Sequence, residues 1–430
     1  MRDRDLRVLL LSALRPVPDF SRLDVLRRSS GSQLRKLLRW LDQSGLALYF
    51  LTQLQDNNAV DRVPENFSRA LDYRLQANRQ RTLAMLGEFE RLVESFHQND
   101  VHFCALKGFT LTPEFCRSAD LRHQTDFDFL VAEDSLEKAK HAMRCCGYEQ
   151  EVTPEADEVT FATPLCHIPS PNDDIYAVPR HREVDLVTKL RLASHGVSID
   201  APAAYFDRIE SKTLHGLSFP ALPAEQMFCL QVMHAFKHLL GSWVRVSWLF
   251  EIGYFVDRHH DDNDLWSEVI ARVGREAKPR NAFGLVISLT KTLFPRRIPQ
   301  VLHDWCLRSL PPRIEAWVTQ FGLKTAISDL DGAKWTLFVH REFVDHRNSW
   351  NSYVRDRIFP VGRQSSIGMV KTADLGTRIK GNVSQWRHTM RRSIFHARTL
   401  FSLPVEAIRW KYALRALEKQ RVLVSPVLTR

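Results

Sequence analysis

The sequence predicts an α+β protein in which a small mixed β-sheet is flanked by N-terminal and C-terminal helical regions. Two helical stretches and one intervening stretch predict this. Apolar side chains recur at helical spacing up to about residue 100 and again after residue 220. Between these stretches, short segments alternate apolar and polar side chains, as half-buried strands do. We therefore divide the chain into an N-terminal helical region (1–63), a sheet-containing core (64–220), a C-terminal helical domain (221–360) and a linker with a basic helical tail (361–430).

The composition is that of an ordinary globular protein. The 430 residues are 44% hydrophobic and 26% charged, enough for two or three domains. Seven cysteines without a repeated C-x-x-C pattern favour a reducing compartment, and we expect a cytoplasmic protein. The first residues predict an amphipathic helix instead of a signal peptide. We expect no transmembrane span, because charged or His residues interrupt every apolar run of about 18 residues.

The net charge of +10 is concentrated at the C-terminus. Residues 371–430 carry thirteen Lys and Arg but only three Asp and Glu, which accounts for the whole excess. Such a tail could meet RNA, an anionic membrane surface or an acidic partner, or it could be a solvated helix that balances an acidic body. All of these alternatives stay open from the sequence.

The first hundred residues predict several helices. Leucines at positions 34, 37, 38 and 41 form one helical stripe, with Ser32 as its expected N-cap. A long amphipathic helix is predicted from Pro64 to about Gln98. Its expected apolar stripe comprises Leu71, Leu75, Leu83, Leu86, Phe89, Leu92 and Phe96. This helix leads directly into the first strand.

The next stretch predicts a strand, a turn, a helix and a second strand. The first strand spans 102–106, Lys107 and Gly108 form the turn, a helix covers Pro113–Ala119, and the second strand is Asp126–Val131. Gly108 would let backbone N–H groups approach a phosphate closely, and the start of the following helix would favour an anion. The turn therefore predicts a phosphate site.

The second strand carries two carboxylates on one face. Side chains in a strand alternate between faces, so Asp126 and Asp128 point the same way, whereas Phe127 and Phe129 point into a core. Adjacent carboxylates repel each other unless a cation compensates their charge. Hard oxygen ligands suit Mg²⁺. A metal beside a phosphate site indicates nucleotide chemistry.

Further strands are expected after this pair. Segments 148–152, 158–167 and 175–178 alternate enough to be strands, and so does 181–187. The last of these places Glu183 and Asp185 on one face. Either residue could supply a third carboxylate.

The strand, turn and D-x-D arrangement resembles the DNA polymerase beta-like nucleotidyltransferase superfamily. It is more closely similar to a bacterial family of largely uncharacterised nucleotidyltransferases marked by L-K-G and then R…D-x-D-x-L-V. Here these motifs are Leu106-Lys107-Gly108, Arg122 and Asp126–Val131, and the resemblance covers roughly residues 30 to 260. It implies that Asp185 is the third carboxylate, although many relatives have His-Trp where this chain has Val187-Thr188-Lys189.

The region after residue 220 adds further polar side chains to this resemblance. His234 and His238 lie four residues apart on one face of a predicted helix. They are either core histidines or contacts to the nucleotide or acceptor, since a zinc site would need a third ligand that the sequence does not provide. Glu251 stands where relatives often have Asp.

The resemblance implies transfer of NMP from an NTP, such as ATP, to an acceptor hydroxyl. Asp126, Asp128 and Asp185 would hold two Mg²⁺ ions, or Mn²⁺ in their place, and Lys107 or Arg122 would neutralise the pyrophosphate. The acceptor could be a protein, peptide, sugar, small metabolite or RNA. Two alternatives stay open: a binding or regulatory module that has lost turnover, and an RNA-binding protein that acts through its basic tail.

Overall fold

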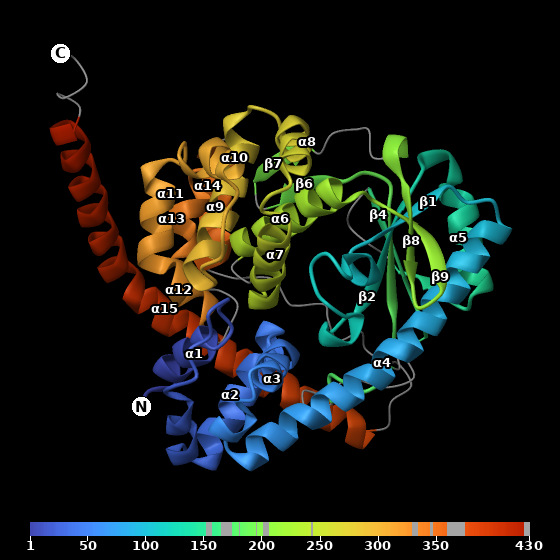
Figure 1. Ribbon diagram of the computed structural model, residues 1–430, viewed down its shortest axis with the longest axis horizontal. Helices are drawn as coiled ribbons and strands as arrows, with labels where there is room; N and C mark the ends of the chain where they lie inside the picture. Colours follow the sequence, from blue (N-terminus) through green and yellow to red (C-terminus); the bar gives the residue numbers. More distant parts are fainter. Residues whose placement is uncertain are drawn as a thin grey trace.

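A mixed seven-stranded sheet and the helices around it form the body of the protein (Figure 1). The computed structural model describes residues 1–151, 157–164, 174–179, 181–194, 196–200, 206–241, 244–328, 334–344, 347–358 and 375–424. The predicted α+β class is confirmed: along the chain, helices precede and follow the segment that forms the sheet. Residues 165–167 of the strand expected at 158–167, and residues 361–374 of the expected linker, lie outside the described residues.

The sheet is organised around strand β2, which carries the D-x-D pair. Across the sheet the order is β3 (Glu149–Gln150), β4 (Glu158–Ala162), β5 (Glu183–Val187), β2 (Asp126–Val131), β1 (Phe103–Leu106), β9 (Leu217–Ala221) and β8 (Glu210–Leu214). Strand β2 runs antiparallel to β1 and parallel to β5. A separate hairpin consists of β6 (Arg191–Ser194) and β7 (Val197–Asp200).

One face of the sheet is apolar and is covered by α4 (Glu65–Gln98) and α5 (Leu136–Cys145). Phe89 of α4 stacks on Phe129 of β2 with ring centroids 5.6 Å apart, and Phe127 lies in the same cluster. As predicted, Asp126 and Asp128 therefore project from the opposite face, the one that faces helices α6 and α7 (Figure 1).

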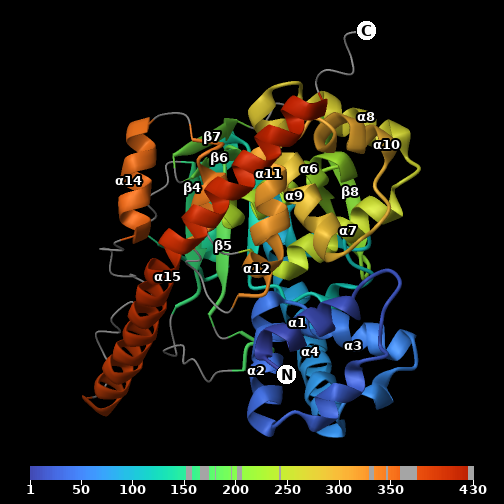
Figure 2. The same cartoon turned by 90° about the vertical axis from the view of Figure 1, so that its left-hand side faces the viewer.

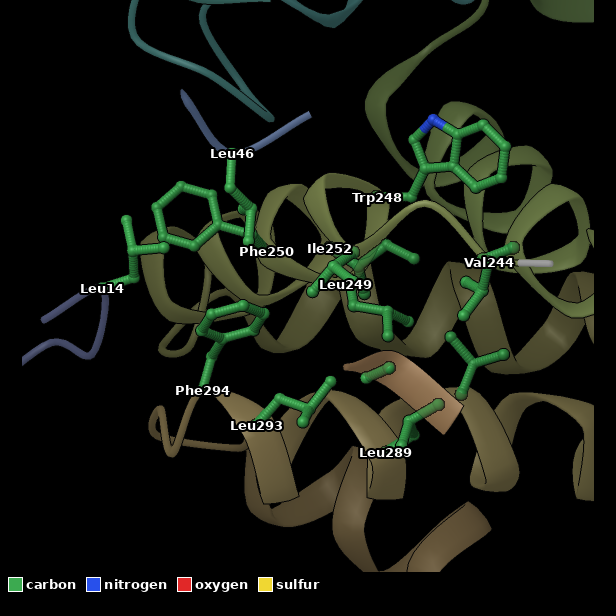
Figure 3. Close-up of a cluster of buried hydrophobic side chains, with 14 of the residues drawn as sticks. Leu14, Leu46, Val244, Trp248, Leu249, Phe250, Ile252, Leu289, Leu293 and Phe294 are labelled. Carbon is green, nitrogen blue, oxygen red and sulfur yellow. The ribbon is translucent and has the colours of Figure 1, made fainter. Parts of the chain in front are cut away.

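The N-terminal and C-terminal helices share a second apolar core. Figure 3 shows Leu14 and Leu46 packed beside Phe250 of α7 and Phe294. The N-terminal helices are α1 (Asp3–Ser12), α2 (Gly31–Ser44) and α3 (Ala47–Asp56). The C-terminal helices are α6 (Ala224–Leu240), α7 (Val246–Arg258), α8 (Asn263–Val273), α9 (Ala277–Leu293), α10 (Gln300–Leu302), α11 (Pro312–Trp317), α12 (Leu323–Ala326), α13 (Thr336–His340) and α14 (Arg347–Ile358). The division into four stretches stays a prediction.

Two expected elements of the core stretch are absent from the described residues. The predicted helix Pro113–Ala119 is not formed: residues 113–118 are turns and irregular backbone between two short 3₁₀ helices, Gly108–Leu111 and Ala119–Leu121. Phe109 packs into the core under the sheet, whereas Phe115 packs into the other core. Burial on both sides overrides helical propensity here. Residues 175–178 form a turn instead of a strand.

Two details of the N-terminal helices also differ from the expectation. The N-cap of α2 is Ser30, not Ser32, because the Ser30 hydroxyl accepts a hydrogen bond from the Gln33 backbone N–H. Helix α4 has the predicted extent, but Leu83 is 66% exposed and lies outside its apolar stripe.

The basic tail is a single long helix, α15 (Leu375–Val424), which crosses the outer surface of the C-terminal helices (Figure 2). The sequence predicts that the Gly- and Ser-containing linker extends to Gly381, but Gly381 lies inside this helix, so the linker ends earlier than predicted. None of the helices in the described part of the chain combines the length and apolar content needed to traverse a bilayer. The six cysteines in that part are free thiols, and Cys166 lies outside it.

Candidate active site

Three carboxylates converge on the polar face of the sheet. The register of β2 and β5 sets Asp128 directly beside Asp185. One ligand oxygen from each of Asp126, Asp128 and Asp185 lies within 4.8 Å of the others, and no other such cluster of His, Cys, Asp or Glu is found in the described ranges. The pleat produces this cluster, because residues two apart on one strand and their neighbours on the adjacent parallel strand share a face.

The structure distinguishes the two acids of β5 by their surroundings. Asp185 is partly buried and accepts a hydrogen bond from the Thr160 hydroxyl of β4 at 2.7 Å. Glu183 has a side chain that is 55% exposed and lies 3.5 Å from His181 Nε2. Asp185 therefore joins the D-x-D pair, whereas Glu183 lies at the outer end of the strand.

Lys107 supplies the positive charge nearest the cluster. Its Nζ lies 2.7 Å from Asp128 Oδ1, and both side chains are largely buried. Burial alone would lower the pKa of Lys107, but Asp128, Asp126 and Asp185 together raise it, so the amine stays charged. Lys107 also has φ 49° and ψ −149°, a backbone conformation that non-glycine residues rarely adopt and that is typical of functional sites.

Two of the three carboxylates are destabilised in their charged forms. Burial raises the pKa of Asp128 to about 6; Lys107 opposes this shift, while Asp126 adds to it. Burial also raises the pKa of Asp185 to about 6, against the hydrogen bond from Thr160 and with the repulsion of Glu158. A single lysine thus compensates the three acids incompletely, and a bound cation would relieve the remaining repulsion.

Gly108 has a local structural role in this turn. Its φ is +48°, and an added Cβ would lie 2.6 Å from Gln124 Nε2. The Gln124 amide in turn donates a hydrogen bond to the backbone carbonyl of Asp126 at 3.0 Å. Glycine here therefore permits close packing of the turn against the start of β2. Phosphate contact by the Gly108 backbone stays a prediction, and the anion-favouring helix expected after it is a short 3₁₀ turn.

Arg122 lies beside the site in a buried ion pair. Its Nε is 3.4 Å from Glu251 Oε2 on α7, and Tyr49 of α3 donates to the other oxygen of Glu251 at 2.9 Å. Arg122 is not among the residues that line the cleft. The pair joins the loop before β2 to both helical regions, and the predicted contact of Arg122 with pyrophosphate stays a prediction.

The loop that delivers β2 is held by polar side chains of α4. The Asn78 amide donates to the backbone carbonyls of Asp120 and Arg122, and the Arg81 guanidinium donates twice to that of Gln124. Arg81 is only 5% exposed. From the sequence, Arg74, Arg79 and Arg81 of α4 are expected to be solvated or salt-bridged. Arg81 differs from this expectation, and its polar position on the helix gives no sign of the buried backbone carbonyl that it contacts.

A cleft of about 1000 Å³ opens over the three carboxylates. It is bounded by the sheet, the β6–β7 hairpin, α6 and the start of α9. His234 and His238 both line it and pack against Trp248 of α7, with ring centroids 4.4 and 4.7 Å away. Burial, together with the charges of Lys107 and His238, lowers the pKa of His234 well below its usual range. His234 is therefore a neutral ring that faces the site.

Several cations that sequence reasoning missed also line the cleft: Lys189, Arg191, Lys237, Arg272 and Lys278. Lys189 pairs with Glu133 at 2.9 Å, and Arg272 lies 3.8 Å from Glu225. The side-chain amine of Lys237 makes no ion pair or hydrogen bond to any residue in the described ranges. Its spacing of three residues after His234, on the same helical face, was the available signal.

A sequence profile of a family described as uncharacterised nucleotidyltransferases matches residues 30–295. The chain belongs to this family. The match begins before α2 and extends past α9, so it contains every residue of the site described above. Searches of curated proteins and of solved structures give no significant match to the chain. Membership of a nucleotidyltransferase family supports nucleotidyl transfer as the general activity.

The donor set fits a hard divalent metal ion. Three clustered carboxylates, two of them buried enough to raise their pKa values, provide oxygen ligands and excess negative charge. The histidines at 234 and 238 contribute to no comparable cluster within the part of the chain that the structure describes. The site therefore suits Mg²⁺ or Mn²⁺ better than zinc.

Proposed function

We propose that the protein transfers NMP from an NTP to an acceptor hydroxyl at this site. The observation that carries the proposal is the convergence of Asp126, Asp128 and Asp185 at the floor of a cleft large enough for a nucleotide. Family membership supports the same reaction class. In this reaction the acceptor oxygen forms a bond to the α-phosphorus. The bond from the α-phosphorus to the oxygen that bridges the α- and β-phosphates breaks, and pyrophosphate is released.

Asp126, Asp128 and Asp185 would hold two Mg²⁺ ions. When bound, these ions would neutralise the triphosphate and lower the pKa of the acceptor hydroxyl. Asp185 is kept in place by Thr160 at 2.7 Å, which limits its freedom before the metals bind. Lys107 pairs with Asp128 in the structure, and it would be able to turn toward phosphate oxygens when a metal ion compensates the charge of Asp128.

Lys237 and His234 of α6 would complete the triphosphate side of the cleft. Within the described residues the amine of Lys237 has no ionic partner, so it can bind a phosphate without breaking an existing pair. His234 is neutral and has Lys107 as a neighbouring charge, so its ring can donate or accept a hydrogen bond from nucleotide or acceptor.

The acceptor would enter past the β6–β7 hairpin and α9. This end of the cleft is lined by Leu192, Ile199 and Phe283, with Arg191 and Lys278 beside them. Apolar walls with a few charged groups suit an organic acceptor with a polar or anionic group. The free thiols and the lack of a bilayer-spanning helix in the described chain support the cytoplasm as the location.

The test has two stages. Thermal shift with ATP, GTP, CTP and UTP, each with and without Mg²⁺, should give a metal-dependent stabilisation for at least one nucleotide. An Asp126→Asn/Asp128→Asn double variant should lose it, whereas Glu183→Gln, a more exposed acid on the neighbouring strand, should retain it. Pyrophosphate release with pooled acceptors then measures turnover. A folded protein that no nucleotide stabilises would refute the proposed site, and stabilisation without pyrophosphate release would favour a binding module.

A further inference from the structure

Helix α15 carries an exposed apolar face that nothing in the described structure covers. Of the fourteen large apolar side chains that are exposed in the described residues, eight belong to this one helix. Phe401 is 83% exposed, Tyr412 66% and Trp386 63%. A stable monomer rarely leaves this many apolar side chains together in water, so the face calls for a partner.

These side chains form one continuous stripe. With about 100° of rotation per residue, seven of them fall within a sector of about 100° that runs for about 39 Å along the helix. They are Trp386, Met390, Ile394, Phe401, Val405, Ile408 and Tyr412. We call this set the apolar stripe of α15.

The opposite side of α15 is fixed to the body of the protein. Glu406 pairs with Lys324 of α12 at 2.7 Å, and the Trp410 ring lies over Phe338, with centroids 5.9 Å apart. Further toward the N-terminus of the helix, His396 lies 3.4 Å from Lys334 Nζ. These contacts fix one side of α15 against the C-terminal helices, whose outer surface it crosses (Figure 2). The apolar stripe lies on the other side of the helix and therefore faces away from them.

Positive charge borders the apolar stripe. Arg398 and Lys411 are exposed and lie along its two edges, and Arg415 lies at its C-terminal end. The helix as a whole contains eleven Lys and Arg but only two acids, and one of these, Glu406, is turned to the body. An apolar face with aromatic side chains and a basic rim is the pattern of helices that lie in the plane of a membrane interface.

The same observations disfavour two other occupants. A second copy of the chain, packed stripe to stripe, would bring the basic edges of both helices together and would be repelled. RNA would match the basic rim, but it offers no apolar surface for the aliphatic side chains Ile394, Val405 and Ile408. Of these three occupants, the anionic bilayer is the one that satisfies both the apolar and the basic components.

We propose that α15 is an interfacial anchor that docks this protein on an anionic lipid bilayer through its apolar stripe. The helix would lie parallel to the membrane, with the stripe in the headgroup region and Arg398, Lys411 and Arg415 near the lipid phosphates. Because the helix is fixed to the C-terminal helices through Glu406 and Trp410, docking would hold the whole body, including the cleft, at the membrane surface.

Vesicle flotation of the full-length protein tests this proposal. The protein should float with phosphatidylcholine vesicles that contain phosphatidylglycerol, not with phosphatidylcholine alone, and added salt should weaken binding. A Phe401→Ser/Ile408→Ser variant should bind about tenfold more weakly or worse, since each side chain loses its burial in lipid. A Lys411→Gln/Arg415→Gln variant should bind about 30-fold more weakly, since each cation near an anionic surface contributes about fivefold.

Matched controls separate the stripe from general stickiness. Leu83→Ser removes an apolar side chain of similar exposure on α4, and Arg308→Gln removes an exposed cation elsewhere; both should bind as wild type. Equal binding to neutral vesicles, or equal loss in the Leu83→Ser control, would overturn the proposal. Two other outcomes would also overturn it. One is a dimer, detected by light scattering, that the Phe401→Ser/Ile408→Ser variant dissociates; the other is salt-sensitive binding of RNA without any binding of vesicles.

Discussion

Replacing Asp185 with Asn should stabilise the metal-free protein above about pH 6 while it abolishes nucleotidyl transfer. Burial raises the pKa of Asp185 to about 6, and Glu158 and Asp126 add to the shift against the opposing hydrogen bond from Thr160. A carboxyl group whose folded pKa exceeds its unfolded pKa favours the folded state at low pH. This contribution is complete below the unfolded pKa of about 4 and is lost as the pH rises through about 6. Asn has no proton to lose, so its contribution does not change with pH.

The magnitude follows from the difference between the two pKa values. A pKa difference of about 2 corresponds to a change of at most about 3 kcal/mol in the free energy of unfolding. Because this carboxylate is only partly buried, contact with solvent reduces the change to about 1–2 kcal/mol. The Asn oxygen can still accept the hydrogen bond from Thr160, so that contact is not lost. Activity should nevertheless fall by about a thousandfold. Without the Asp185 carboxylate the site would lose a ligand for the metal ion that would stabilise the negative charge of the transition state.

Thermal denaturation in EDTA between about pH 4 and pH 8 measures the effect, with a shift of about 1–2 °C in Tm per kcal/mol for a chain of this size. Wild type and Asp185→Asn should coincide at the acidic end, diverge between about pH 4 and pH 6, and differ by a constant amount at higher pH. Mg²⁺ should stabilise wild type far more than the variant. Glu183→Gln is the matched control, because its side chain is 55% exposed, and it should change neither stability nor activity appreciably. A lower Tm for Asp185→Asn in EDTA at pH 8 would refute the reasoning about clustered charge.

Three further substitutions test neighbouring parts of the site. Gly108→Ala should lower the free energy of unfolding by about 1–3 kcal/mol in denaturant titrations, because φ is +48° and the new Cβ would lie 2.6 Å from Gln124 Nε2. Adding Gln124→Ala should restore only the part of this loss that is due to the clash. Arg122→Ala should lower the free energy of unfolding by about 3 kcal/mol, because the side chain of Glu251 is 2% exposed and would lose its cation. A variant that stays stable but loses kcat selectively would place Arg122 at the pyrophosphate instead. Lys237→Met should raise KM for the NTP about tenfold without lowering Tm, since losing one charge-assisted contact to a phosphate costs about 1.4 kcal/mol of binding free energy. An effect on kcat alone would contradict a binding role for Lys237.

The polar face of β2 could be predicted from sequence because it depends on strand period alone. Asp126 and Asp128 alternate with two phenylalanines, and any strand through these residues must separate the acids from the core. The choice between Glu183 and Asp185 could not be made this way, since both share one face of β5. It depends on the neighbouring strand β4, where Thr160 holds Asp185, and the position of β4 beside β5 is a long-range property.

The cations of the cleft were missed for a related reason. Lys189, Lys237 and Lys278 belong to a loop and to two helices that are far apart in sequence, and each by itself reads as an ordinary polar position. They meet only because the β6–β7 hairpin and α9 pack around α6. The helix expected at Pro113–Ala119 failed because two cores compete for its apolar side chains. Local patterns therefore predicted the chemistry of the site, and tertiary packing decided its boundary.

The apolar core behind β2 explains how the sheet holds three mutually repelling carboxylates. Phe127 and Phe129 leave the strand on the side opposite the acids and pack with Phe89 of α4, at 5.7 and 5.6 Å between centroids. A fully buried phenylalanine contributes about 1.5–3 kcal/mol, so this cluster can offset the charge repulsion on the other face. This packing keeps the acids together on one face of the strand, where a bound cation would relieve their repulsion. The alternation of Asp and Phe along β2 would thus link the stability of the fold to the metal affinity proposed for the site.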